Sequence, residues 1–228
     1  MPKVAALFVE SNGVYFGLDA VQPWDESSDA RTYGGPLPVV AHPPCARWGR
    51  YWSGGPSAKI RLVLGDDDGC FESALASVRK YGGVLEHPEA THAWAAFGLR
   101  APDWDGGWVP ADDMGGFTCC VSQGHYGHEA RKMTWLYLFG LPYDELPSLK
   151  WGATFDKVRM EDSFHSAAAL REGMRDRRNN GAVENRLGRK ARSRTPLPFR
   201  DLLIGIAASC DPARAQVLQS TLDFEGNS

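Results

Sequence analysis

The sequence predicts a single α/β domain built in three layers, because short apolar strands alternate with helical patterns. We expect strands at residues 3–9, 37–41, 84–86, 117–122 and 132–140. We expect helices at residues 70–81 and 89–99, and an amphipathic helix at residues 198–208. Such an alternation is typical of a sheet covered by helices on both faces.

The elements have recognisable boundaries. The strand at 37–41 is a short apolar run, and the strand at 84–86 is expected to stop at His87-Pro88. In the helix at 70–81, Phe71, Leu75 and Val78 recur at positions i, i+4 and i+7, and glycines follow its end. Residues 14–35 are mixed in pattern, and a glycine-rich loop is expected at 46–69.

Composition excludes several classes of protein. The chain has 228 residues, of which 43% are hydrophobic and 23% charged, as in ordinary globular domains. No apolar run is long enough to span a membrane. The five cysteines form no CxxC pair, which argues against a disulfide framework and favours a cytoplasmic location. The histidines match no set of metal ligands, and we expect His42 and His87 to form hydrogen bonds beside the site.

The charge is unevenly distributed. Residues 175–194 contain eight basic and two acidic residues, a net charge of +6, which leaves −9 for the rest of a chain whose total is −3. A basic segment on an acidic body indicates contact with a phosphate backbone, although an arginine-rich solvated loop has the same composition. The residues expected to contact nucleic acid are Arg47, Arg178, Arg189, Lys190, Arg192 and Arg194.

We therefore divide the chain into three parts. Residues 1–140 are expected to form a catalytic α/β core. Residues 141–193 are expected to form a small, irregular, basic lobe that faces DNA. Residues 194–228 are expected to return to the core as a helix and to end in a loose tail.

The stretch His42-Pro43-Pro44-Cys45 carries the strongest chemical signal. It follows the apolar run at 37–41, and two prolines make the turn before Cys45 stiff. A thiol held in this way is a candidate nucleophile, whereas a lone cysteine is more often a small buried side chain. Glu86 ends another strand 41 residues later and is a candidate acid, or else a cap of a turn.

The order of these pieces resembles the DNA cytosine-5 methyltransferase family. Four patches carry the resemblance: Pro44-Cys45, Glu86, the segment from Tyr126-Gly127 to Lys132-Met133-Thr134, and Arg194-Thr195-Pro196 before the last helix. They resemble the family's proline-cysteine loop, the glutamate of its Glu-Asn-Val motif, its Tyr-Gly turn with a Gln-x-Arg-x-Arg strand, and its late Thr-Pro helix start. His87-Pro88 replaces Asn-Val here, and Lys132 and Thr134 replace the two arginines.

The resemblance implies a Rossmann-like methyltransferase fold and transfer of a methyl group to carbon 5 of cytosine in DNA. Cys45 is then the nucleophile at carbon 6, which makes carbon 5 able to attack an electrophilic methyl group. Glu86 supplies a proton or a strong hydrogen bond at ring nitrogen 3, and Lys132 is the charge partner of the thiolate. The base must leave the duplex to be reached, and the loop at 46–69 is the candidate for closing over it.

The donor implied by the resemblance is S-adenosyl-L-methionine, with a site at Phe8, Gly13, Asp25 and Pro44. The family's Asp-Leu-Phe-x-Gly-x-Gly-Gly turn is reduced here to Leu7, Phe8 and Gly13. Asp25 stands where an acidic residue holds the ribose. The interval from Phe8 to Cys45 is shorter than in the family, so a strand-helix unit that would contact the adenine is missing from the pattern.

Two alternative functions remain open from the sequence. The first is a DNA-binding protein that keeps the base pocket without catalysis. The second is a pyrimidine-modifying enzyme that uses another one-carbon donor. Trp48, Trp52 and Trp94 are equally compatible with stacking on a base and with packing in the core.

Overall fold

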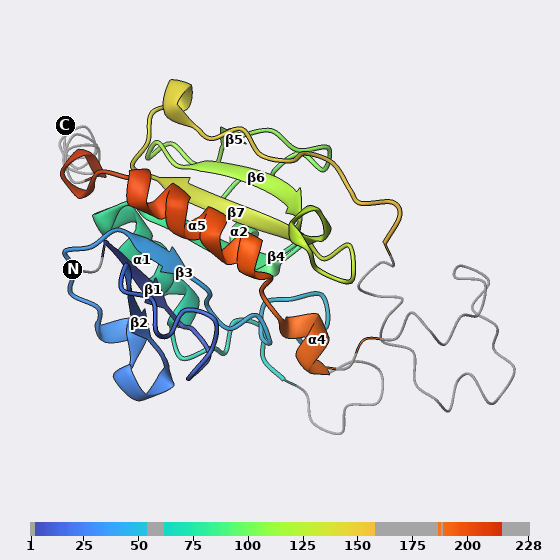
Figure 1. Ribbon diagram of the computed structural model, residues 1–228, viewed down its shortest axis with the longest axis horizontal. Coiled ribbons are helices and arrows are strands. Elements are labelled where there is room, and N and C mark those ends of the chain that lie inside the picture. The colour runs from blue at the N-terminus through green and yellow to red at the C-terminus, as the bar shows by residue number, and fades with distance from the viewer. Residues whose placement is uncertain (1–2, 54–61, 158–186, 188, 216–228) are drawn as a thin grey trace, which may run out of the picture.

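The computed structural model describes residues 3–53, 62–157, 187 and 189–215, and these form a mixed α/β structure around one sheet (Figure 1). The sheet has seven strands in the order β2-β1-β3-β4-β7-β6-β5. The strands are β1 (Val4–Leu7), β2 (Val21–Trp24), β3 (Val39–Ala41), β4 (Gly83–Pro88), β5 (Val109–Pro110), β6 (Phe117–Ser122) and β7 (Met133–Phe139). Strands β2, β1, β3 and β4 are parallel, whereas β7, β6 and β5 join by antiparallel pairing.

Helices cover both faces of the sheet, as the sequence predicts. Helix α1 (Cys70–Tyr81) packs on β3, β4 and β7, and α5 (Leu197–Ser209) packs on β4, β3 and β1 from the opposite face (Figure 1). Successive strand residues serve the two cores in turn: Val39 and Ala41 belong to the α1 core and Val40 to the α5 core. Strands buried on both faces explain the continuous apolar runs in the sequence.

The last helix returns to the sheet because its apolar face is wide. Phe199 and Leu203 are fully buried and Ile206 is nearly so, while Leu202 is only partly buried. Replacing a large core side chain such as Phe199 by alanine typically costs about 3–5 kcal/mol, so this face holds the C-terminal part of the chain firmly on the sheet.

The shorter elements refine the sequence prediction. Helix α2 spans His92–Ala96, and 3₁₀ turns occur at η1 (Glu26–Ser28), η2 (Ala30–Thr32), η3 (Gln123–Tyr126) and η4 (Tyr143–Glu145). Strands β2 and β5 were not predicted, because each is short and contains a proline, which weakens the pattern; both lie at the two edges of the sheet, where proline is tolerated. Strand β4 runs through His87 and Pro88 rather than stopping at them.

Most of the expected basic lobe at 141–193 lies outside the described residues. The part that is described includes α4 (Arg189–Ser193), a helix where the sequence predicted irregular structure. The loose tail expected at the C-terminus also lies largely outside the described residues. No helix in the described ranges is long and apolar enough to cross a lipid bilayer.

Candidate functional site

A large cavity opens at the carboxyl ends of the parallel strands. Its volume is about 1630 Å³, and its wall, which residues 192–195 also line, is formed mainly by the chain just after β1 and β3, by the end of β4, and by the residues just before and at the start of β7. These four positions meet because β7 runs antiparallel to its neighbour, so that its beginning lies beside the carboxyl ends of the parallel strands. The cavity also lies where the chain leaves β1 toward β2 on one side and returns as β3 on the other, which is the usual place for a ligand in α/β sheets.

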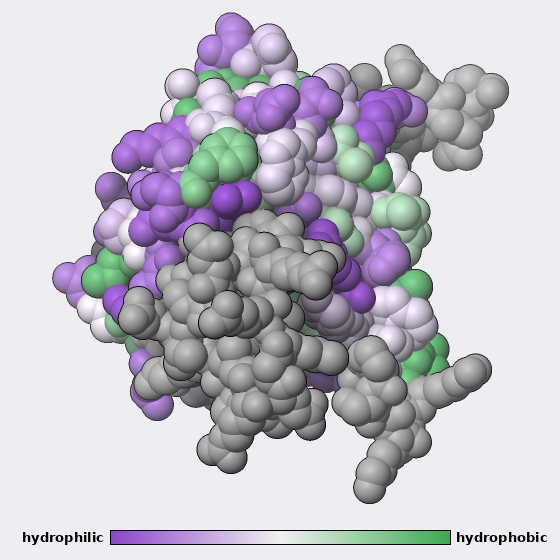
Figure 2. All heavy atoms as spheres, turned by 90° about the vertical axis from the view of Figure 1, so that its right-hand side faces the viewer, coloured by the Kyte–Doolittle hydropathy of each residue, from purple (hydrophilic) through white to green (hydrophobic). Residues whose placement is uncertain are grey.

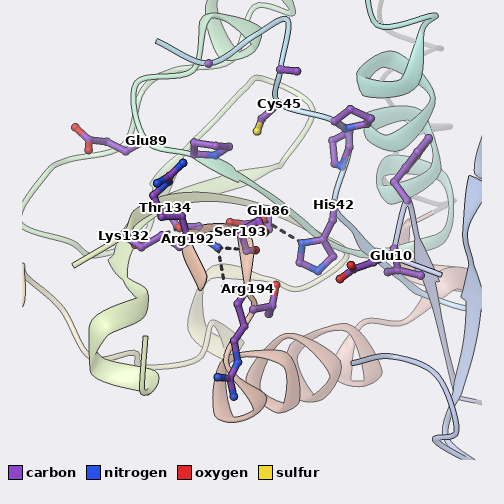
Figure 3. A pocket seen from close by; sticks show the side chains of 18 of the residues that line it. Glu10, His42, Cys45, Glu86, Glu89, Lys132, Thr134, Arg192, Ser193 and Arg194 are labelled. Carbon is purple, nitrogen blue, oxygen red and sulfur yellow. Dashed lines mark hydrogen bonds and ion pairs between the residues drawn. The ribbon is translucent and has the colours of Figure 1, made fainter. Parts of the chain in front are cut away.

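Cys45 stands on the loop that follows β3. The amide hydrogens of Trp48 and Gly49 both point to the carbonyl oxygen of Cys45, at N–O distances of 3.1 and 2.8 Å, and close a tight turn behind it. The side chain is exposed on the cavity wall, and its sulfur points toward the level of Glu86 (Figure 3). The prolines before Cys45 and this turn after it constrain the backbone that carries the thiol, as the sequence predicts.

The protein groups around the thiol do not activate it. Desolvation by the surrounding chain raises the pKa of Cys45, and the negative charge of Glu86 raises it further, while Lys132 opposes them. The thiol is therefore protonated at neutral pH and has to lose its proton before it can act as a nucleophile.

Glu86 lies on β4 with its side chain largely covered at the cavity wall. Burial alone would raise the pKa of this carboxyl group, but the hydrogen bond from His42 and the positive charge of Lys132 outweigh burial and lower it to about 2. Glu86 is thus ionised at neutral pH. Residues 45, 86 and 132, expected together on sequence grounds, do line the same cavity.

Lys132 is the residue immediately before β7, and it lines the cavity. Its ammonium nitrogen lies 3.3 Å from the carbonyl oxygen of Ser193 and 3.1 Å from that of Arg194 (Figure 3). Burial lowers the pKa of Lys132, and the charge of Glu86 and the nearby Cys45 partly restore it. The lysine therefore joins the carboxylate side of the site to the segment between α4 and α5.

The cavity wall has a positive balance of charge. Six basic and three acidic side chains line it. Among the basic residues expected to contact nucleic acid, three line this cavity: Arg47, Arg192 and Arg194. Arg178 lies outside the described residues, and the backbones of Arg189 and Lys190 lie in α4. Figure 2 faces the side of α4, and hydrophilic side chains gather on much of its visible surface.

The structure brings together only some of the residues that were expected to bind the methyl donor. Phe8, Gly13 and Pro44 line the cavity, and Glu10 joins them with its carboxylate near His42 (Figure 3). Asp25 does not line it. Its carboxylate instead accepts hydrogen bonds from Ser11 at 2.6 Å and from Ser27, which lower its pKa to about 2, and it caps η1. Gly13 is needed for a tight turn, because a Cβ there would lie 2.7 Å from the carbonyl oxygen of Glu10.

Of the three tryptophans and His87, some lie in the hydrophobic core and one lines the cavity. Trp48 and Trp94 are buried in the core, whereas Trp52 lines the cavity. His87 is fully buried, contacts Thr91 at 2.7 Å and is kept neutral by burial, which lowers its pKa to about 4. Its alternation along β4 turns it into the α1 core, away from Glu86.

Several residues of the site were missed on sequence grounds, among them Tyr15, Trp104 and Gln123. Tyr15 and Trp104 line the cavity, and Gln123 contacts Glu86 from η3. Tyr15 lies in a segment without a regular pattern, and Gln123 is a single amide at the end of a strand, so no local signal marked either of them. In the described ranges, no group of three or more His, Cys, Asp and Glu side chains is placed to hold a metal ion.

Comparison with known proteins yields no matching family model, no matching curated sequence and no matching solved structure. The function therefore has to be argued from the site itself.

Proposed function

We propose that this protein modifies cytosine in DNA through a covalent bond between Cys45 and carbon 6 of the ring. The observation that carries the proposal is the convergence of Cys45, Glu86 and Lys132 on one cavity with a basic wall, from the loop after β3, from β4 and from the residue before β7. A cavity of about 1630 Å³ has room for an extruded base and part of a second ligand.

In the proposed reaction the Cys45 thiol first gives its proton to solvent. The sulfur then forms a bond to carbon 6, and the electron pair of the carbon 5–carbon 6 double bond makes carbon 5 nucleophilic. Lys132 offsets the developing negative charge, and Glu86 contacts the ring edge at nitrogen 3 and the amino group. Carbon 5 can take up an electrophile, after which loss of its hydrogen and of the sulfur restores the double bond.

The donor implied by the resemblance is S-adenosylmethionine, which would make the protein a cytosine-5 methyltransferase with a Rossmann-like fold. The order of the parallel strands and the position of the cavity support such a fold. The residues present fit this donor only at its amino-acid end, where Glu10 can meet a cationic group. The carboxylate of Asp25 is already engaged by its own loop, so the described residues do not complete a nucleoside site.

The proposal is tested by a reaction that needs no donor. Reversible addition of a thiolate at carbon 6 lets carbon 5 exchange its hydrogen with solvent, so DNA incubated with the protein in deuterated water should gain deuterium at carbon 5 of cytosine. Cys45→Ser should abolish the exchange. Cys70→Ser is the matched control, because Cys70 begins α1 and does not line the cavity. Exchange that survives in Cys45→Ser would remove Cys45 from the chemistry.

A second candidate function is a DNA-binding protein without catalysis. Two observations favour it: the pKa of Cys45 is raised, and the Asp25 carboxylate is engaged by a hydrogen bond from Ser11. DNA binding without carbon 5 exchange would support this candidate. Calorimetry with S-adenosylmethionine then separates the donors: exchange without binding of this compound favours another one-carbon donor.

A further inference from the structure

Two exposed aromatic side chains line the cavity from loops that are far apart in the chain. Tyr51 lies in the loop after β3 and is 55% exposed, and Trp104 lies between α2 and β5 and is 44% exposed. Large aromatic side chains are mostly packed in the interior, because each then removes a large apolar area from water. A single exposed aromatic is ordinary on a protein surface, whereas two on the wall of one cavity indicate a binding surface.

Trp104 stands at the tip of a tight turn. The amide of Gly106 donates to the carbonyl oxygen of Asp103 at 3.2 Å, so Trp104 occupies the second position of a four-residue turn. A Cβ at Gly106 would lie 2.8 Å from the side chain of Trp151, so the backbone of the turn packs directly against that residue. The turn is therefore held at its base, while the ring at its tip stays accessible to a ligand.

The loop after β3 presents Tyr51 in a similar way. The amide of Trp52 donates to the carbonyl oxygen of Gly49 at 3.0 Å, which places Tyr51 in the third position of another turn and Arg50 in the second. Arg50 pairs with Glu89 across 3.6 Å, and its side chain is 48% exposed. An ion pair of such an exposed side chain contributes little stability, so a phosphate can take the place of the carboxylate.

The surroundings of the two rings suit a nucleotide strand. Basic side chains outnumber acidic ones on the wall, and arginine and aromatic residues follow one another from Arg47 to Trp52. Proteins that bind unpaired nucleic acid combine a basic groove with aromatic side chains on which bases stack. The volume of about 1630 Å³ exceeds the roughly 300–1,000 Å³ of a pocket for one small ligand, which leaves room for nucleotides beside the reacting base.

We propose that Tyr51 and Trp104 stack on unpaired bases that flank the reacting cytosine, and that the preferred substrate is therefore single-stranded DNA. This inference rests on the proposed function. In a duplex each base is covered on both faces by its neighbours and presents only its edges in the grooves. Rings on the cavity wall can stack on such bases only after several of them have left the helix, and unpairing and unstacking cost free energy. A single strand presents the same faces without unpairing.

The test compares two forms of one labelled oligonucleotide that contains a single cytosine, alone or annealed to its complement. Binding is measured by fluorescence anisotropy with the Cys45→Ser protein, which cannot form the covalent bond. The single strand should bind at least about tenfold more tightly than the duplex. Electrostatic attraction alone favours the duplex, which carries more charge per unit length. Equal binding of the two forms, or tighter binding of the duplex, overturns the inference.

Substitution of the rings tests stacking directly. In the same background, Trp104→Ala and Tyr51→Ala should each weaken binding of the single strand about 5- to 100-fold, whereas Trp104→Phe keeps a ring and should stay near the parent value. None of these changes removes a charge, so the slope of log K against log salt should not change. Tyr143→Ala is the matched control, because Tyr143 is 68% exposed in η4 and does not line the cavity.

Three results would contradict stacking on unpaired bases. An equal loss of affinity in Tyr143→Ala would mean that the effect is not specific to the cavity. An equal loss for duplex and single strand in Trp104→Ala would mean that the ring acts as a wedge in a duplex. Single-strand affinity that is unchanged in both alanine variants would exclude the rings from the interface. Each result removes the inference alone, whereas the absence of binding to either form of DNA removes the proposed function as well.

Discussion

The ammonium nitrogen of Lys132 lies 3.1 Å from the carbonyl oxygen of Arg194, a residue 62 positions later in the chain. The same nitrogen also donates to the carbonyl oxygen of Ser193. One side chain therefore satisfies two backbone acceptors just before α5. Lys132 adopts a backbone φ of 34°, which is unfavourable for a residue with a side chain. Such strain is retained where the surroundings require it, here at the point that joins β7, the cavity and the basic segment.

The first prediction concerns the reactivity of Cys45. Removal of positive charge in Lys132→Met should raise the thiol pKa and slow alkylation of Cys45 by iodoacetamide at about pH 7. Removal of negative charge in Glu86→Gln should lower the thiol pKa and speed alkylation. We expect changes of about two- to tenfold, because one pKa unit changes the thiolate fraction tenfold.

The alkylated residue is identified by mass spectrometry, because the chain has five cysteines. Arg131→Gln is the matched control, since Arg131 lines the same cavity without being one of the charges that shift the thiol. If both Lys132→Met and Glu86→Gln changed the rate in the same direction, the electrostatic coupling of the three groups would be refuted.

The second prediction concerns stability in acid. The pKa of Glu86 is about 2 in the folded protein and near 4.5 in an unfolded chain, so its ionised form contributes stability that is complete above about pH 5. That contribution falls as the pH is lowered toward the folded pKa. Between about pH 5 and about pH 3 the parent protein should lose roughly 2 kcal/mol more stability than Glu86→Gln.

Urea unfolding of both proteins at several pH values provides the measurement. Asp25 titrates in the same direction, because its hydrogen bonds from Ser11 and Ser27 also lower its pKa to about 2. Its contribution is common to both proteins and cancels in the comparison. Identical pH dependences of the free energy of unfolding would mean that Glu86 is not stabilised as a carboxylate.

Much of the fold was accessible from the sequence, because apolar runs and helical periodicity are local signals. The helix at 70–81 matches α1 to the residue, and the strand at 37–41 contains β3. Strand pairing is not local: β7 lies between β4 and β6, although the chain forms β5 and β6 before it. The pairing of β7 beside β4 is what places Lys132 next to Glu86.

Site residues in motifs that follow strands could be predicted from the sequence. Single residues that come together only in the fold could not. Cys45 follows one parallel strand and Glu86 lies in the second half of another, near the carboxyl ends where functional residues of α/β sheets gather. Asp25 occupies the equivalent place after β2, but two serines in its own loop satisfy its carboxylate. Tyr15 contacts His42 and Gln123 contacts Glu86, and these partners, far apart in sequence, are brought together only by the fold.

The third prediction concerns DNA affinity and salt. Arg47 and Arg194 reach the cavity wall from different loops, and each is expected to contact a phosphate. Replacement of either by glutamine should weaken DNA binding and lower the slope of log K against log salt by about 0.9 for double-stranded DNA. Arg100→Gln is the control, because Arg100 pairs with Asp113 and does not line the cavity.

Fluorescence anisotropy with labelled DNA at four or more salt concentrations measures these slopes. A smaller slope in Arg100→Gln as well would indicate diffuse attraction rather than contacts at the cavity. Slopes equal to that of the parent protein in both Arg47→Gln and Arg194→Gln would exclude these residues from the DNA interface.

The last prediction tests the pairing that brings β4, and with it Glu86, beside β3. Gly83 begins β4 with a φ of 132°, and a Cβ at this position would lie 2.0 Å from the carbonyl oxygen of Val39. No rotation of a side chain relieves a clash between a Cβ and the backbone, so Gly83→Ala has to separate the two strands. We expect it to lower the free energy of unfolding by more than about 3 kcal/mol and to reduce carbon 5 exchange.

Gly205→Ala is the matched control: a Cβ there meets nothing within 4 Å, and alanine in an exposed helix position should stabilise the protein by up to about 1 kcal/mol. If urea unfolding gave the two variants equal stability, the register between β3 and β4 described here would be wrong, and Cys45 and Glu86 would have no common wall on which to meet.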